Sequence, residues 1–232
     1  MDLTQFLIIL AQAGMLVNAM LIAAAYMVLA ERKIAAWIQN RVGPNRVGWW
    51  GMLQSFADVF KLYLKEDIVP AAADYKFHAL APVISIGVAI TVYAVIPWSP
   101  PFVTIDGVSY GLAMAPNMNI GILTVLAMTS VGVYGIALAG WSSNNKYSLM
   151  GGLRSSAQMI SYELSMGLAV IAVVMMSGSL NLLTIIQTQT ANGWNVFYQP
   201  LAFLIFFITA LAETNRAPFD LPEAEPELVG GY

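Results

Sequence analysis

Apolar residues gather in five blocks along the chain, and the connections between these blocks hold most of the charged residues. The blocks lie at about residues 3 to 30, 77 to 98, 118 to 140, 159 to 178 and 200 to 213. A bilayer core about 30 Å thick needs a helix of about 20 apolar residues. The fifth block is short for a span unless its helix continues into the following segment. The pattern predicts an all-α fold, a polytopic transmembrane helical bundle with five spans.

The distribution of positive charge predicts how the chain crosses the membrane. All ten lysines and arginines fall in three polar segments, at residues 31 to 76, 141 to 158 and 214 to 232. Positively charged loops stay on the cytoplasmic side or on the equivalent matrix side. With five alternating spans, the N-terminus is therefore expected outside.

The first positively charged segment is long without being uniformly polar. Between residues 49 and 65, polar side chains recur at steps of four, three and four, at Gln54, Asp58, Lys61 and Lys65. This spacing puts them on one stripe of a helix. It predicts an amphipathic helix at the membrane boundary, which either anchors the chain there or forms the wall of a cavity entered from the lipid.

The outer connections carry signals for smaller elements. Residues 103 to 110 alternate around Asp106-Gly107, which predicts a small surface β-hairpin. The stretch from 181 to 189 is expected to form a short interfacial helix or a structural loop. Pro200 is well placed to open the fifth helix.

Composition narrows the classes of function. Of 232 residues, 59% are hydrophobic and only 10% are charged, against about 25% charged in soluble proteins. We therefore expect a single transmembrane domain over residues 1–232. A net charge of -3 without a basic run excludes nucleic-acid binding. With no cysteine and one histidine, His78, the chain cannot ligate an iron-sulfur cluster, and any redox centre must lie on a partner.

Acidic residues in or beside the apolar blocks are the candidates for chemistry, because a charge at the centre of a membrane helix costs about 2.5 to 3.5 kcal/mol. Glu163 lies a few residues inside the fourth block, either as a functional acid or as an ordinary acid near the end of a helix. Glu213 closes the fifth block and begins an acidic tract that continues through Asp220, Glu223, Glu225 and Glu227.

Keeping a carboxyl with an ordinary pKa of about 4.3 protonated at pH 7 costs roughly 3.7 kcal/mol, comparable with leaving it charged in an apolar site. These acids are therefore candidates for proton exchange, and a solvated acidic loop is the alternative. The basic residues after the first block need no special role, because attraction to anionic headgroups at about 1 kcal/mol each accounts for most of them. Phosphate-loop, dinucleotide, zinc-protease and nucleophile-elbow motifs are missing from the sequence, so no self-contained active site is expected.

Three long motifs carry a resemblance to a known family. The first is Glu31-Arg32-Lys33 followed by Gln-Asn-Arg-Val-Gly-Pro-Asn-Arg-Val-Gly at residues 39 to 48. The second runs from Gly-Trp-Ser-Ser-Asn-Asn-Lys-Tyr-Ser at 140 to 148 to Ser-Tyr-Glu at 161 to 163, and the third is Glu-Thr-Asn-Arg-Ala-Pro-Phe-Asp-Leu-Pro-Glu-Ala-Glu at 213 to 225. In this order and spacing, the chain resembles the H subunit (subunit 1) in the membrane arm of respiratory complex I, NADH:quinone oxidoreductase.

The resemblance implies a subunit that forms part of the chamber admitting ubiquinone or menaquinone, and that starts the proton path coupled to quinone reduction. Electrons would come from an iron-sulfur cluster on a neighbouring subunit, and this chain would bind no cofactor of its own. By motif match, the residues of the quinone chamber are Glu31, Arg32, Trp37, Arg41, Asp58, Lys61, Lys65 and Arg216. Those of the proton path are Glu163, Glu213, Glu223, Glu225, Glu227 and Asp220.

The implied partners are the peripheral-arm quinone-module subunits, the antiporter-like membrane subunits, membrane lipids and quinone. The implied location is the bacterial cytoplasmic (inner) membrane, with the mitochondrial inner membrane as the alternative. The family has about eight transmembrane helices, so this sequence is expected to be truncated after the acidic motif. Three other interpretations remain open: the homologous membrane subunit of an energy-converting hydrogenase, a stand-alone transporter, which would show internal repeats and broken helices, and a non-catalytic membrane anchor.

Overall fold

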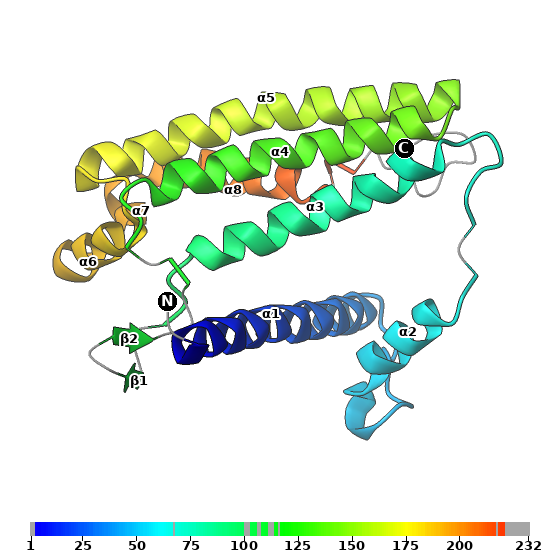
Figure 1. Cartoon of the computed structure of the whole chain (residues 1–232), viewed down its shortest axis with the longest axis horizontal. Coiled ribbons are helices and arrows are strands. Elements are labelled where there is room, and N and C mark those ends of the chain that lie inside the picture. Colours follow the sequence, from blue (N-terminus) through cyan, green and yellow to red (C-terminus); the bar gives the residue numbers. More distant parts are fainter. Residues whose placement is uncertain are drawn as a thin grey trace. The chain divides into compact units, whose positions relative to one another are not determined.

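The structure, a computed structural model, describes residues 3–66, 68–99, 103–105, 108–110, 114–115, 117–216 and 218–220. The chain divides into two compact units, Met1–Ile68 and Val69–Tyr232. Both consist mainly of helices, as the apolar pattern predicts (Figure 1). Among the described residues, four helices are long and apolar enough to cross a membrane by length and composition.

The first unit is dominated by one long helix, α1 (Leu3–Ile38). The apolar block ends at residue 30, but the helix continues because residues 31–33, Glu-Arg-Lys, are good helix formers. The helix ends where Asn40 adopts a left-handed φ of 52°. The Arg41 N–H then donates to the Ala36 carbonyl at 2.9 Å, as in a typical helix C-terminus.

Two short helices follow in the same unit: the 3₁₀-helix η1 (Trp49–Gly51) and the α-helix α2 (Gln54–Tyr63). The helix predicted over 49 to 65 is thus observed in its central part only. Trp50 breaks its beginning with a left-handed φ of 56°. Gly51 also has a positive φ, and a Cβ there would lie 2.1 Å from the carbonyl oxygen of Pro44, so this turn requires glycine.

The second unit is built around α3 (Tyr75–Val95), α4 (Gly121–Ser142), α5 (Lys146–Ser177) and α8 (Pro200–Glu213). Helix α3 packs on α4, α4 on α5, and α5 on α8. Figure 1 shows α3, α4 and α5 running side by side. The first three predicted spans of this unit correspond to α3, α4 and α5, while α8 has only 14 residues and stands below the length of a standard span.

Glycines set how closely these helices approach. A Cβ on Gly135 of α4 would lie 2.4 Å from Ser85 Oγ and 3.1 Å from the Ala81 carbonyl oxygen on α3. A Cβ on Gly140 would lie 3.1 Å from the Cα of Gly152 on α5. Backbone-to-backbone contact of this kind fixes the two crossings with little freedom to slide.

Polar caps define helix ends that hydropathy alone does not locate. The Asp74 side chain accepts from the Lys76 N–H at the start of α3, and the Asn145 side chain accepts from the Tyr147 N–H at the start of α5. Helix α5 therefore begins 13 residues before the fourth apolar block and ends at Gly178, whose φ of 64° is left-handed.

The two connections between these helices that were expected on the outer side contain small elements of regular structure. Strands β1 (Val103–Ile105) and β2 (Val108–Tyr110) pair antiparallel, which confirms the hairpin around residues 106 and 107. Of the two alternatives for residues 181 to 189, the structure has the helix: α6 (Leu182–Asn192) extends three residues beyond that stretch. The one-turn helix α7 (Asn195–Tyr198) follows, and Pro200 opens α8 as predicted.

Candidate functional site

The first part of the candidate site lies between α4, α5 and α8, and its centre is Glu163. This residue is in the middle of α5, 17 residues after Lys146 and 14 before Ser177. The alternative that it is an ordinary acid near the end of a helix is wrong, because the polar residues 146 to 158 belong to the same helix. Its side chain is half-buried.

Two hydroxyl groups of α4 face the Glu163 carboxylate. Ser130 Oγ donates to Glu163 Oε1 in a short contact, and Thr129 Oγ1 lies 3.5 Å from the same oxygen. Both hydroxyls also reach the carbonyl oxygen of Leu126, one turn back along α4, at 2.9 Å. A carboxyl group in an apolar helix bundle is therefore supplied with polar partners from the neighbouring helix.

The second carboxyl group, Glu213, is the last residue of α8 and is also half-buried. Its carboxyl group is close enough to Glu163 for the two to interact electrostatically. Counted along their helices, Glu163 is about 21 Å from Ser177 and Glu213 about 20 Å from Pro200, so both acids lie at a similar distance from the ends joined by α6 and α7.

The segment after α8 returns to α5 beside this pair. Gln158 Nε2 donates to the Phe219 carbonyl oxygen at 2.9 Å. One turn further along α5, the ring of Tyr162 packs edge-on against the ring of Phe219, with centroids 5.0 Å apart. The second and third sequence motifs, which lie some 50 residues apart, therefore meet at the carboxyl pair. Asp220 and Arg216 lie exposed on this segment, and Glu223, Glu225 and Glu227 fall outside the described residues.

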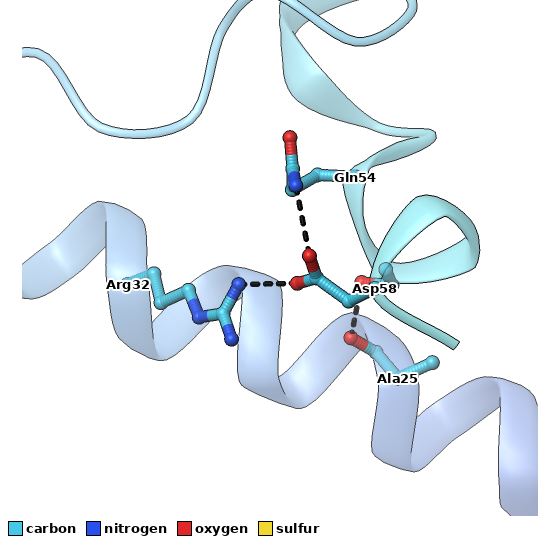
Figure 2. Close-up of polar contacts among 5 residues, drawn as sticks. Ala25, Arg32, Gln54 and Asp58 are labelled. Carbon is cyan, nitrogen blue, oxygen red and sulfur yellow. Dashed lines mark hydrogen bonds and ion pairs between the residues drawn. The ribbon is translucent and has the colours of Figure 1, made fainter. Parts of the chain in front are cut away.

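The second part of the candidate site lies between α1 and α2. Figure 2 shows Asp58 of α2 bound by two donors: Arg32 of α1 forms an ion pair with it, and Gln54 Nε2 donates to it at 2.9 Å. These hydrogen bonds lower the pKa of the Asp58 carboxyl below its usual value, and the bond from Gln54 has the larger effect. Ser55 Oγ donates to the Ala25 carbonyl oxygen at 2.7 Å. This hydrogen bond and the Arg32–Asp58 ion pair both hold α2 on α1.

Tryptophans line two cavities in this first unit. One has a volume of about 500 Å³ and the other about 630 Å³, and both are bordered by Lys33, Trp37, Trp49 and Trp50. The Lys33 ammonium donates to the Trp50 carbonyl oxygen and lies 5.6 Å from the centre of a Trp50 ring. Volumes of this size are within the range of small-molecule sites, which are mostly apolar with a few polar groups.

Four of the other residues expected at the quinone chamber are on the surface of this unit, while the fifth, Arg216, belongs to the second unit. Glu31, Arg41, Lys61 and Lys65 are exposed, and Arg41 Nε donates to Gln39 Oε1 at 2.7 Å. Of the eight residues in that set, the structure joins Arg32 to Asp58 directly and places Trp37 on the cavities.

A third cavity of about 510 Å³ lies between α4, α5, α7 and α8, near the end of α5 that is remote from Lys146. Its lining is apolar and amide-bearing, with Gln199 donating to the Ala172 carbonyl oxygen at 3.0 Å, and it holds no ionisable side chain. Among the described residues, no three histidine, cysteine or acidic side chains gather as metal ligands would.

Sequence reasoning missed the partners of the predicted acids. Ser130 and Thr129 are a polar pair inside the apolar block 118 to 140, which was the available signal. The sequence gives no signal for the contact between Lys33 and Trp50, because this contact involves a left-handed backbone at Trp50.

The sequence matches the NADH dehydrogenase family over residues 11–232. It is 56% identical over 224 residues to NADH-quinone oxidoreductase subunit 8 of Rhodothermus marinus, covering 95% of this chain and 62% of that protein. It is 53% identical to the NADH-quinone oxidoreductase H subunit of Salinibacter ruber, with the same coverage. It is 52% identical to the first NADH-quinone oxidoreductase H subunit of Geobacter sulfurreducens, covering 91% of this chain and 64% of that protein. The chain thus spans a little over six-tenths of the length of these relatives.

Proposed function

The chain belongs to the NADH dehydrogenase family, and on that premise we propose that it serves as a membrane-arm subunit of proton-translocating NADH:quinone oxidoreductase. In this role it provides walls of the quinone chamber and the first acids of a proton path. The electrons reach quinone from an iron-sulfur cluster on a neighbouring subunit. The observation that carries the proposal is the pair of half-buried acids, Glu163 and Glu213, on adjacent helices of an apolar bundle.

The chemistry of the acid pair suits a proton relay. Because the two carboxyl groups interact, adding or removing a negative charge nearby changes which of them holds a proton. Reduction of quinone changes charge and consumes protons at the chamber, and this is the signal to which the pair responds. Asp220 and the acids at 223, 225 and 227 continue the path toward the antiporter-like subunits.

The chamber itself is assigned to the first unit. The tryptophan-bordered cavities between α1 and η1 offer flat aromatic faces for a quinone ring, and Lys33 offers a donor for one of its carbonyl oxygens. The Arg32–Asp58 pair keeps α2 against α1, and η1, which precedes α2 in the chain, borders both cavities. Glu31, Arg41, Lys61 and Lys65 complete the charged rim, and for Arg216 a role at the chamber is proposed from its sequence motif alone.

We further propose that α8 is a fifth span, that the N-terminus lies outside, and that α2 lies at the inner membrane surface. In this arrangement both units belong to one transmembrane domain in a bacterial cytoplasmic membrane. Single cysteines placed at Ser143 and at Ala191 test the topology in sealed vesicles. The first should react with an impermeant reagent only from the inner side and the second only from the outer side. Labelling of both positions from one side contradicts the proposal.

The proton path is tested by Glu163→Gln and Glu213→Gln in the assembled enzyme, with Glu66→Gln as the matched control at an exposed acid outside both parts of the site. Each site variant is expected to lower the number of protons moved per electron pair, because glutamine keeps the shape but holds no exchangeable acid proton. The control should keep the wild-type ratio. Normal quinone reduction together with normal pumping in both site variants removes the pair from the mechanism.

A further inference from the structure

The Ser130 hydroxyl has a single proton but two acceptors. Its oxygen is 2.9 Å from the Leu126 carbonyl oxygen, and it also contacts Glu163 Oε1. A hydroxyl group donates one hydrogen bond and accepts up to two. Ser130 can therefore satisfy Glu163 or Leu126 as a donor, but only one of them at a time.

Other serines in the same bundle show what an ordinary helical serine does. Ser161 Oγ donates to the Ala157 carbonyl oxygen at 2.8 Å, and Ser177 Oγ reaches the carbonyl oxygen of Val173 at 3.1 Å. These bonds run back along their own helix, as is usual for serine in membrane helices. Ser130 has the same bond and adds a carboxyl partner from the neighbouring helix.

We propose that Ser130 is a positioning residue for Glu163, and that its hydroxyl reverses the direction of their hydrogen bond when Glu163 gains or loses a proton. With Glu163 ionised, Ser130 donates to the carboxylate. With Glu163 protonated, the acid donates to Ser130 Oγ and the serine proton turns to the Leu126 carbonyl oxygen. Ser130 keeps its own proton throughout, and the proton that neutralises Glu163 comes from outside the pair.

This reversal leaves both protonation states of Glu163 with a partner, which a fixed donor could not do. A donor such as an amide N–H stabilises the ionised acid and leaves the protonated acid with a poor contact. Thr129 repeats the arrangement at a longer distance of 3.5 Å, so it is a weaker second partner. The reversible hydrogen bond thus lowers the difference in free energy between the ionised and the protonated state of Glu163, both of which occur in a proton relay.

Among the described residues, the titratable side chains nearest to Glu163 on α5 itself are Tyr162 and, more than two turns away, Arg154. From α8, Glu213 faces Glu163, and the segment after α8 carries Arg216 and Asp220, both exposed. On α4 the titratable residue is Tyr134, one turn beyond Ser130 and exposed, while α6 carries no titratable residue. A change in titration caused by altering Ser130 therefore reports the hydroxyl, as long as Glu213 is unchanged.

The test uses the assembled complex and the carboxyl stretching band of Glu163 in infrared difference spectra, identified by its loss in Glu163→Gln. The variants are the isosteric pair Ser130→Thr and Ser130→Val, together with Ser130→Ala, and Ser177→Ala is the control. Removing the hydroxyl should move the pH midpoint of the band upward by about one unit, since the hydrogen bond lost by the ionised acid is stronger than the one lost by the protonated acid. Ser130→Thr and the control should keep the wild-type midpoint.

Equal midpoints in Ser130→Val and Ser130→Thr overturn the inference, and this comparison stands even if the alanine variant fails to assemble. A shift that also appears in Ser177→Ala overturns it as well, because it would reflect bundle packing and not the hydroxyl. The importance of Ser130 to proton pumping rests on the proposed function, but the expected shift of the Glu163 infrared band does not depend on it. Normal pumping in Glu163→Gln together with a shifted band in Ser130→Val would reject the proton path and retain the Ser130 contact.

Discussion

Replacing Gly140 with alanine should loosen the contact between α4 and α5, and with it the site that this contact aligns. The added Cβ would lie 2.8 Å from the Ser148 carbonyl oxygen and 3.1 Å from the Cα of Gly152. Both are backbone atoms, so the clash cannot be relieved by turning a side chain. Carbon atoms in good contact are about 3.5 to 4.0 Å apart, so the helices must separate by a few tenths of an ångström or more.

The size of the effect follows from two opposing terms. Overpacking of a tight contact costs about 1 to 3 kcal/mol, whereas replacing glycine by alanine inside a helix gains about 0.5 to 1 kcal/mol. Gly132 of α4 is the matched control, because a Cβ there would meet only the Val88 side chain, at 3.9 Å. Gly132→Ala keeps the gain without the clash, so the two variants should differ in free energy of unfolding by about 1 to 3 kcal/mol.

The difference is measured by thermal unfolding of the purified chain in detergent, followed by helical circular dichroism. For a chain of this size, about 2 kcal/mol corresponds to a change in Tm of about 4 to 8 °C. We expect Gly140→Ala to unfold at the lower temperature and Gly132→Ala at or slightly above the wild-type value. If Gly140→Ala melts at the same temperature as Gly132→Ala or higher, the close crossing does not hold α4 on α5.

Three further outcomes are expected. Asp58→Asn removes the ion pair with Arg32 and should speed hydrogen exchange in α2, and equal exchange rates in variant and wild type at about pH 7 would refute this. Because the pKa of Asp58 is lowered in the folded chain, the ion pair stabilises the wild type above about pH 4, and this stabilisation disappears as the pH falls through the lowered pKa. Asn181→Ala removes the cap of α6 and should cost about 1 kcal/mol, seen as faster exchange in the first turn of that helix and contradicted by unchanged rates there. Gln158→Ala removes the hydrogen bond to the Phe219 carbonyl oxygen and should speed hydrogen exchange of the Phe219 amide about 2- to 10-fold. An exchange rate equal to that of the wild type would show that Gln158 does not stabilise the turn around Phe219.

The apolar pattern predicts where the long helices lie, but not where they end. Hydropathy marks the part of a helix that faces lipid, whereas a helix ends where its backbone hydrogen bonds end. Helix α1 passes the charged residues 31–33 and stops at the left-handed Asn40, and α5 starts at the Asn145 cap, well before its apolar part. The hairpin was predictable because its signal is local, in the alternation around residues 106 and 107.

The acids of the site were predictable one by one, because a carboxyl in an apolar block stands out. Their partners were not, since Ser130 lies 33 residues from Glu163 and meets it only through the crossing of α4 and α5 at Gly140 and Gly152. The return of Phe219 onto α5 likewise depends on a turn in which Asn215 has a left-handed φ of 49°. Pairing across helices follows from the geometry of packing, which a single sequence does not specify.

The shortness of α8 bears on the lipid around it. Fourteen residues rise about 21 Å, roughly 9 Å less than an average hydrocarbon layer, and such hydrophobic mismatch is met by thinning of the adjacent leaflet at fractions of a kcal/mol per ångström. If α8 spans the membrane from the outer surface, as proposed above, headgroups and water are drawn inward to the level of Glu213. Water would then approach this acid from the inner leaflet through a local thinning of the membrane.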